Sequence, residues 1–250
     1  MNERNHWNRI GSGYDDEIFD VFRSDRNKLL PTYFLRHADP KGKAIDFGCG
    51  TGKAFPYLSA AFGKVTGYDI SEELLKVADS RRFTNVRVHQ ADLTRKNLRF
   101  DAADFLFCCN VIMLPEMEMN MAMFRNVHKA LKKGGHAVLI VPSLESMFYT
   151  AFRLIDWNRR EGTKASAIPA SDMAYFSAPK HQLAEGIIHI DKVPTKHYLE
   201  PELRVLLKEA GLTVTSTERV EYEWTSEFAE PPKWMKEPYP WDWLVECRRG

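Results

Sequence analysis

The sequence lacks an excess of charge of either sign, and this limits the partners that it can have. Lys and Arg total 35 and Asp and Glu total 34, so the formal charge is only +1. Proteins that follow a phosphate backbone or an anionic lipid surface are usually strongly basic over the binding face. We therefore expect neither a nucleic acid nor a membrane as a partner. Hydrophobic residues make up 44%, which is enough for a packed domain and excludes a disordered chain.

Long apolar runs and regularly spaced cysteines are also scarce. The longest aliphatic run covers residues 137–141, far short of the roughly 20 residues that a membrane helix needs. The first residues, MNERNHWNRI, contain no apolar secretory core. The four cysteines have no C-x-x-C spacing, so we expect neither a disulfide framework nor a metal site. A cytoplasmic location is the simplest expectation, and the sequence leaves the oligomeric state open.

Short apolar runs alternate with helical patterns between residues 43 and 141, which is typical of a parallel sheet with crossover helices. We expect the strands at 44–47, 65–68, 86–90, 104–109 and 136–141, with two more at 212–217 and 243–247. Ser71 and the acids after it predict the start of a helix. Further helices are expected over residues 116–132 and from Pro201 to the stop at Gly211.

Two regions do not follow this alternation. Residues 143–193 read as an irregular insertion, and residues 225–240 contain four prolines, which exclude regular structure from most of that stretch. We expect a single domain over residues 1–250. It comprises an N-terminal helical arm (1–40), a core (41–142), a cap insertion (143–193) and a C-terminal helix with a strand pair (194–250).

The most informative segment is AIDFGCGTGK, an apolar strand that leads into a glycine-rich turn. A dinucleotide-binding fingerprint, G-x-G-x-x-G, fails because Lys53 stands where the third glycine belongs. A phosphate-binding P-loop fails because Phe47 replaces its first glycine and Ala54 replaces its Ser or Thr. An acid followed by G-x-G-x-G remains.

DFGCGTG closely resembles the first motif of the class I S-adenosylmethionine-dependent methyltransferases. Further matches follow in the expected order, with Asp69 in VTGYDIS, Asp92 in VHQADL and Asn110 in FLFCCNVIML. LKKGGHAVLIV resembles the fifth-strand block, and KHYLEPELRVLLKEAGLTV resembles the last helix and sixth strand. The resemblance covers residues 40–142 and 195–248. It implies an α/β fold with a Rossmann-like, doubly wound, seven-stranded and mostly parallel sheet whose last strand is antiparallel, and S-adenosyl-L-methionine as cofactor.

The resemblance also implies roles for individual residues. Asp69 would accept hydrogen bonds from both ribose hydroxyls, Ile70 would pack on the adenine, and Asp92 with Leu93 would flank the adenine and its amino group. The remaining cofactor-binding residues that it implies are Tyr14, Asp46, Gly48, Gly50, Gly52 and Asn110. Each acid also has a structural alternative, because Asp69 can cap the following helix and Asp92 can hold a turn. We interpret Cys49 as a packing residue.

The methyl acceptor is expected at the carboxyl edge of the sheet, where the insertion and the proline-rich connection both begin. Trp224, Trp234, Trp241 and Trp243 lie in or beside that connection. Together with the N-terminal arm, these segments predict an aromatic-lined, capped pocket. The alternative is that the tryptophans form a small core of their own under a long loop.

Methyl transfer is an in-line displacement in which positioning supplies much of the rate, so a base is needed only where the acceptor loses a proton. The candidate bases are His181, His189, His197 and Tyr198. We favour His197 as catalytic residue because KVPTKHY precedes the final helix near the expected pocket.

The sequence therefore predicts a methyltransferase that acts on a small molecule. One alternative is a methyltransferase for RNA, DNA or protein, but Val-Ile-Met follows Asn110 where an N-P-P-[YFW] tetrapeptide would be expected for such acceptors. A second alternative is a non-catalytic protein of the same fold that binds S-adenosylmethionine.

Overall fold

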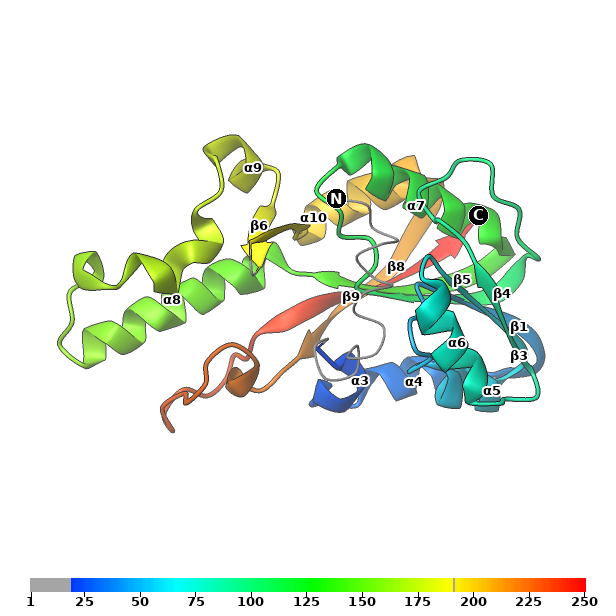
Figure 1. Ribbon diagram of the computed structural model, residues 1–250, viewed down its shortest axis with the longest axis horizontal. Coiled ribbons are helices and arrows are strands. Elements are labelled where there is room, and N and C mark those ends of the chain that lie inside the picture. The colour runs from blue at the N-terminus through cyan, green and yellow to red at the C-terminus, as the bar shows by residue number, and fades with distance from the viewer. Residues whose placement is uncertain (1–18, 191) are drawn as a thin grey trace.

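A seven-stranded sheet forms the centre of the computed structural model, which describes residues 19–190 and 192–250. The strand order is β3-β2-β1-β4-β5-β9-β8, and β9 runs antiparallel to both of its neighbours (Figure 1). This confirms the expected fold class. The strands are β1 (Asp39–Phe47), β2 (Phe62–Asp69), β3 (Val86–Gln90), β4 (Ala103–Cys109), β5 (Leu131–Pro142), β8 (Leu212–Glu221) and β9 (Trp241–Arg249).

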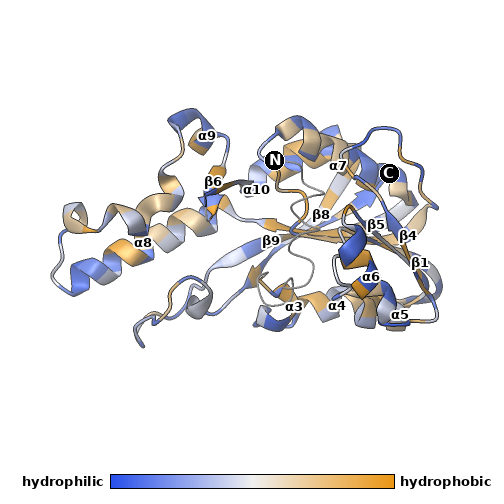
Figure 2. Cartoon of the chain, viewed as in Figure 1, coloured by the Kyte–Doolittle hydropathy of each residue, from blue (hydrophilic) through white to orange (hydrophobic). Residues whose placement is uncertain are grey.

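Helices cover both faces of this sheet, and successive strand residues serve opposite faces. In β4, Phe105 and Phe107 pack with the helices of one face, while Leu106 and Cys108 pack with those of the other. The first face carries α3 (Val21–Ser24), α4 (Leu29–Arg36), α5 (Phe55–Ala61) and α6 (Glu72–Ser80). The second face carries α7 (Met117–Ala130) and α10 (Glu200–Glu209). Figure 2 shows the apolar residues gathered along the central strands.

The helix boundaries follow the capping residues. The Ser71 hydroxyl accepts a hydrogen bond from the Leu74 amide at 3.3 Å, so α6 begins where the sequence predicts. A proline occupies the first turn of α10, and Gly211 follows that helix with φ +85°. None of the helices in the described residues is long and apolar enough to cross a membrane.

The insertion contains more regular structure than the sequence predicts. Helix α8 (Leu144–Arg160) projects from the carboxyl edge of the sheet (Figure 1), and the Ser143 hydroxyl caps it by accepting the Ser146 amide at 3.0 Å. The prediction of an irregular insertion is therefore wrong for these residues. The rest of the insertion is made of short elements, namely η1 (Ala165–Ala167), η2 (Ala170–Phe176), α9 (Lys180–Ala184), β6 (Ile187–Ile190) and β7 (Val193–Lys196).

The proline-rich connection is irregular apart from the short turn η3 (Trp224–Ser226), as predicted. It packs on α8 through a small separate core in which Trp224, Met235 and Tyr239 are buried. Trp241 and Trp243 instead belong to the main core of the second face. The alternative of a small core under a long loop is thus confirmed for Trp224.

Candidate functional site

The glycine-rich turn follows β1 and needs its glycines for two reasons. Gly48, Gly50 and Gly52 all have positive φ, at +66°, +51° and +79°, a region that residues with a side chain rarely adopt. Space is also lacking, because a Cβ atom on Gly48 would lie 2.1 Å from Cγ2 of Val111. The amides of Gly48 and Cys49 both donate to the carbonyl of Tyr68, which holds the turn against β2.

Asp69 connects the end of β2 to this turn. Its Oδ2 accepts the Gly50 amide at 2.9 Å and its Oδ1 accepts the Ser71 amide at 2.8 Å. Burial raises the pKa of the carboxyl group, while these amides oppose the shift. Each carboxylate oxygen can accept two hydrogen bonds. Asp69 therefore shapes the turn and keeps acceptor capacity for a ligand with a diol.

Two buried residues belong to the same segment, Asp46 just before the turn and Cys49 within it. Asp46 is 3% exposed near the end of β1, and both burial and the neighbouring Asp69 raise its pKa. The Cys49 thiol is buried and its pKa is raised by burial. Its Sγ lies 2.9 Å from where a Cβ on Gly67 would stand, so Cys49 packs against the β2 backbone as predicted. A buried, protonated thiol is a poor nucleophile.

Asp92 holds the turn after β3. Its Oδ1 accepts the amide and the hydroxyl of Thr94, at 3.1 and 2.6 Å, and its Oδ2 lies 3.3 Å from Nε of Arg95. Burial acts to raise the pKa of Asp92, but these hydrogen bonds outweigh it and the pKa is lowered. Leu93 is buried in the core of the second face. Ile70 directly follows β2, and its carbonyl accepts a hydrogen bond from Nε2 of Gln90, the last residue of β3, at 3.0 Å.

Asn110 directly follows β4, and its side chain contacts β9. Its backbone has φ +52°, and its Nδ2 donates to Oδ2 of Asp242 at 3.1 Å. The Tyr222 hydroxyl donates to the same oxygen at 2.8 Å. Burial raises the pKa of Asp242 to about 6, although both hydrogen bonds oppose the shift. Asp242 pairs with Pro142 at the end of β5, so this carboxyl group lies at the carboxyl edge of the sheet.

The start of the described chain meets the same edge. Oδ2 of Asp20 lies 3.1 Å from Nζ of Lys53, which follows the glycine-rich turn. The rings of Phe19 and Tyr222 are in edge contact, with centroids 4.8 Å apart. Tyr14, the other residue expected from this arm, lies outside the described residues.

Residues 44–135 match a family model described as a methyltransferase domain. A demethylmenaquinone methyltransferase of Tropheryma whipplei is 25% identical over 88% of this chain and 87% of the relative. The solved structure described as a DhpI-SAM-HEP complex is 18% identical, with a TM-score of 0.63 over 98% of this chain and 95% of the other.

The chain is an S-adenosylmethionine-dependent methyltransferase. An S-adenosylmethionine-dependent methyltransferase from Mesorhizobium loti has the same fold, with a TM-score of 0.61, 19% identity, and coverage of 89% of this chain and 97% of the other. A dTDP-3-amino-3,6-dideoxy-alpha-D-glucopyranose N,N-dimethyltransferase of Streptomyces fradiae is 26% identical, but over only 49% of this chain and 51% of the relative. The cofactor is S-adenosylmethionine. The residues present suit it, because the turn holds no side chain at its three glycines and a buried carboxylate stands beside it.

The structure brings some of the candidate bases of the methyltransferase to the carboxyl edge. Tyr198 pairs with Ser143 directly after β5, and His197 precedes it. His197 is 6% exposed, its Nδ1 lies 3.1 Å from the carbonyl of Thr195, and burial lowers its pKa to about 4. His181 and His189 lie farther out on the insertion, in α9 and β6.

The sequence interpretation did not include Asp242 or Tyr222 among the site residues. The one signal for Asp242 is its place in WDWLV, where an acid stands between two tryptophans at the start of an apolar run. Such an acid is costly to bury unless it is hydrogen-bonded, which makes it a candidate for function.

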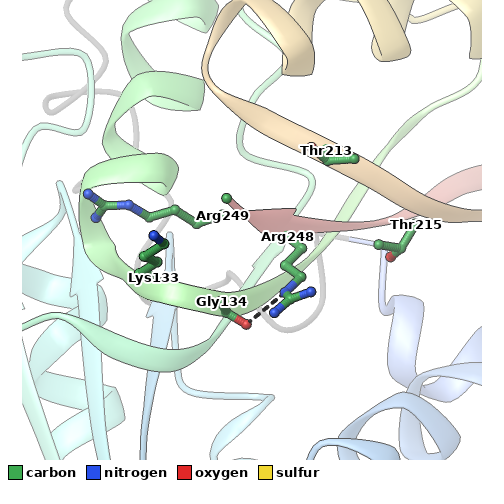
Figure 3. Close-up of a pocket in the computed structure, with 7 residues that line it drawn as sticks. Lys133, Gly134, Thr213, Thr215, Arg248 and Arg249 are labelled. Carbon is green, nitrogen blue, oxygen red and sulfur yellow. Dashed lines mark hydrogen bonds between the residues drawn. The ribbon is translucent and has the colours of Figure 1, made fainter.

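A surface hollow of about 490 Å³ lies at the other end of the sheet (Figure 3). Its lining includes Lys133 and Gly134 at the start of β5 and Arg248 and Arg249 at the end of β9. These positions mark the amino ends of the parallel strands. Ligands of open α/β sheets bind beyond the carboxyl ends instead, so this hollow is not the methyl-transfer site.

Proposed function

We propose that this methyltransferase transfers a methyl group to a small molecule that binds at the carboxyl edge of the sheet, beside the ends of β4 and β5 and the start of β9. The observation that carries the proposal is the convergence of three covering segments on this edge. Phe19 of the N-terminal segment contacts Tyr222, and the Trp241 amide donates to the Ser146 hydroxyl of α8 at 2.8 Å. A site enclosed on several sides suits a small acceptor better than a polymer.

The charge and the relatives support the same acceptor class. The net charge of +1 provides no general attraction for a polyanion. The relatives from Tropheryma whipplei and Streptomyces fradiae are named for a quinone and for a sugar nucleotide, both small molecules.

For the cofactor, we propose that Asp69 holds the ribose and that the turn of Gly48, Gly50 and Gly52, with Asp46 just before it, holds the methionine end. Ile70, Asp92 and Leu93 would surround the adenine, and Tyr14 and Asn110 would complete the site. Support comes from the position of Asp69, whose carboxylate is fixed against the turn by the amides of Gly50 and Ser71. A prearranged acceptor loses little entropy when a diol binds.

When bound, S-adenosylmethionine supplies a methyl group on a sulfonium that is already activated for in-line displacement. The chain must orient the acceptor, exclude water and take up a proton where the acceptor carries one. Two groups at this edge are candidates for the proton. His197 has a pKa of about 4 and is a weak base, whereas Asp242 has a pKa of about 6, closer to neutral pH.

The geometry favours Asp242 over His197 for this step. Asn110 and Tyr222 both donate to its Oδ2, which leaves Oδ1 to receive a proton from an acceptor. Tyr222 contacts the N-terminal segment, and Asn110 precedes Val111, whose side chain lies over Gly48. Asp242 is thus linked through Asn110 and Val111 to the glycine-rich turn that we propose holds the cofactor.

The test combines binding with turnover. We expect S-adenosylmethionine and S-adenosylhomocysteine, but not NAD, to raise the melting temperature, because a ligand of the folded state stabilises it. Release of S-adenosylhomocysteine is then measured with quinols, phenols, amino sugars, RNA and protein as acceptors. Turnover with a small molecule is the expected result. Turnover with RNA or protein only would overturn the acceptor class, and cofactor binding without turnover on any acceptor would indicate a non-catalytic protein.

Asp242→Asn and His197→Gln distinguish the two bases. If Asp242 takes the proton, D242N lowers kcat by about 10²-fold or more while the affinity for S-adenosylmethionine is retained, and H197Q remains active. The opposite pattern would assign the role to His197. Equal activity of both variants and the unmodified enzyme would show that positioning alone suffices.

A further inference from the structure

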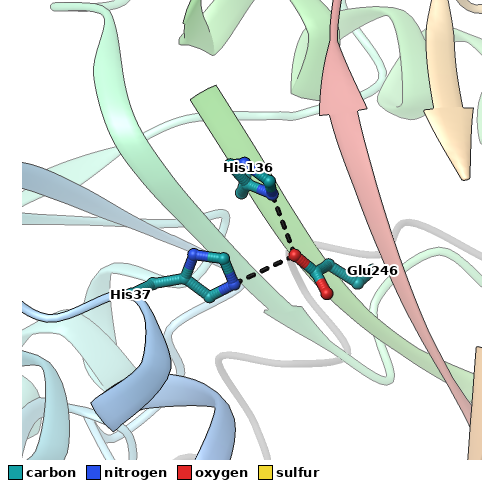
Figure 4. A group of neighbouring side chains, drawn as sticks. All are labelled: His37, His136 and Glu246. Carbon is teal, nitrogen blue, oxygen red and sulfur yellow. Dashed lines mark hydrogen bonds and ion pairs between the residues drawn. The ribbon is translucent and has the colours of Figure 1, made fainter. Parts of the chain in front are cut away.

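Two histidines and a glutamate converge on the face of the sheet that α4 covers (Figure 4). His37 follows the last residue of α4, His136 lies on β5 and Glu246 lies on β9. Oε1 of Glu246 is 2.8 Å from Nδ1 of His136 and 3.0 Å from Nε2 of His37. All three atoms lie within 4.8 Å of one another.

The sheet register explains why His136 and Glu246 share a face. Glu246 pairs directly with Val138 across the antiparallel β5–β9 ladder. His136 lies two residues before Val138, so its side chain points to the same side as that of Glu246, as a diagonal neighbour. The end of α4 then brings His37 over this pair. The three side chains come from three elements that the fold holds in fixed positions.

The hydrogen bonds of Glu246 leave one oxygen for the histidines. Its Oε2 accepts the Ser216 hydroxyl at 3.3 Å and lies 3.6 Å from Nη1 of Arg36. Its Oε1 faces both imidazole rings. These partners orient the carboxylate and balance its charge without occupying Oε1, as the supporting residues of metal ligands commonly do.

The His37 ring is incompletely satisfied in this arrangement. Nε2 of His37 is buried and makes no hydrogen bond of acceptable geometry, although it lies 3.0 Å from Oε1. A buried imidazole nitrogen that makes no hydrogen bond is unfavourable. Burial lowers the pKa of His37, and the charges of His136 and Arg36 lower it further. The charge of Glu246 acts in the opposite direction but does not outweigh them. The neutral ring is the form that binds a metal.

We propose that His37, His136 and Glu246 bind one divalent transition-metal ion of the zinc class. The ligand atoms are Nε2, Nδ1 and Oε1, and a water molecule completes a tetrahedral set. Two imidazoles and one carboxylate are a donor set that suits zinc, whereas magnesium and calcium prefer oxygen ligands throughout. This proposal revises the expectation of no metal site that the cysteine spacing alone supports.

The position of the site gives it a structural role. Glu246 and Asp242 are four residues apart on β9, which corresponds to about 13 Å along a strand. The ion would therefore not touch the reacting groups at the carboxyl edge. It would join the end of α4 to β5 and β9, and by binding the folded state it would raise the free energy of unfolding.

The test uses the full chain after removal of bound metal with a chelator. Zinc is titrated in competition with a chromophoric chelator, and one ion per chain is expected. His136→Gln and Glu246→Gln should each weaken binding by about tenfold or more, while His89→Gln, at an exposed histidine on β3, should not. Circular dichroism of each variant in chelator verifies that it is folded.

Cobalt provides a second measurement that needs no variant. Cobalt bound to two nitrogens and one oxygen gives visible absorption without the near-ultraviolet charge-transfer band of a thiolate ligand. Stoichiometric binding with that spectrum supports the site. The proposal is overturned by the absence of stoichiometric binding, by a thiolate band, or by affinities that H136Q and E246Q leave unchanged. None of these outcomes depends on the methyl acceptor.

Discussion

The carboxamide of Asn110 donates to the carboxylate of Asp242 across 3.1 Å, although the two residues are 132 positions apart. The contact exists because β9 runs antiparallel to β5, which places the first residues of β9 beside the end of β5 and one strand away from the end of β4. Asn110 lies in the left-handed region, with φ +52°, and its amide donates to the carbonyl of Ile140 at 2.9 Å. Asparagine tolerates this conformation better than most residues. Asn110 thus has two roles: it adopts a left-handed backbone conformation, and its side chain donates a hydrogen bond to Asp242.

Replacing Asn110 separates these two roles. Asn110→Ala and Asn110→Gly both remove the donor to Asp242, but only glycine accepts the positive φ without strain. We expect the free energy of unfolding of N110A to be lower than that of N110G by about 1 kcal/mol. Urea unfolding of the two variants measures this difference. Equal stabilities of the two variants would show that the backbone conformation of Asn110 carries no cost.

Asp242 should make stability depend on pH. Its pKa in the folded protein is about 6, above the ordinary value of 3.8, so the folded state binds the proton more tightly than the unfolded chain does. The contribution is fully present below about pH 4 and is lost as the pH rises to about 6. Asp242→Asn removes this loss. We therefore expect D242N to be more stable than the unmodified protein at pH 8, by about 1–3 kcal/mol, and nearly equal at pH 4.

Urea unfolding at pH 4, 6 and 8 measures this difference. Asp172→Asn is the matched control, because Asp172 is exposed on the insertion, and it should give the same difference at every pH. A D242N difference that is constant with pH, or greater stability of the unmodified protein at pH 8, would contradict the expected ionisation of Asp242.

The parallel part of the fold could be predicted because its signals are local. Strand β3 begins and ends at the predicted residues, and the predicted residues of β4 and β5 lie within the observed strands. The observed β1 and β5 begin earlier than predicted. The added residues are mainly charged residues, glycines and a proline, and Leu131 is the one buried apolar side chain among them. Hydrophobic patterning detects only the covered part of a strand.

The features that the sequence did not reveal depend on distant pairings. The partners of Asp242 become visible only once β9 is aligned with β5, and His37 approaches Glu246 only once α4 is packed on the sheet. The missed helix α8 is different, because Ser143 and the spacing of Phe148 and Phe152 are local helix signals. Both phenylalanines are about half exposed, at 51% and 55%. An apolar face that is only partly covered weakens the inference that the helix packs on a core.

The turn after β1 should be sensitive to steric change. Gly48→Ala places a Cβ 2.1 Å from Cγ2 of Val111 and imposes a side chain on φ +66°. We expect a loss of about 2–4 kcal/mol in the free energy of unfolding and weaker binding of S-adenosylmethionine. Adding Val111→Ala removes the collision but not the strain, so the double variant should recover part of the loss. A double variant no more stable than G48A would show that the collision with Val111 is not the cause.

Asp69 should affect cofactor affinity more than any exposed acid of the same region. Asp69→Ala removes the proposed ribose acceptor and releases the amides of Gly50 and Ser71. We expect the affinity for S-adenosylmethionine to fall by about 1–3 kcal/mol, which is roughly 5- to 150-fold. Asp79→Ala, at an exposed position on α6, is the matched control and should bind normally. Calorimetry with S-adenosylmethionine and with methionine separates the causes, because loss of a ribose contact weakens only the ligand that carries a ribose. Unchanged affinity of D69A would remove Asp69 from the cofactor site.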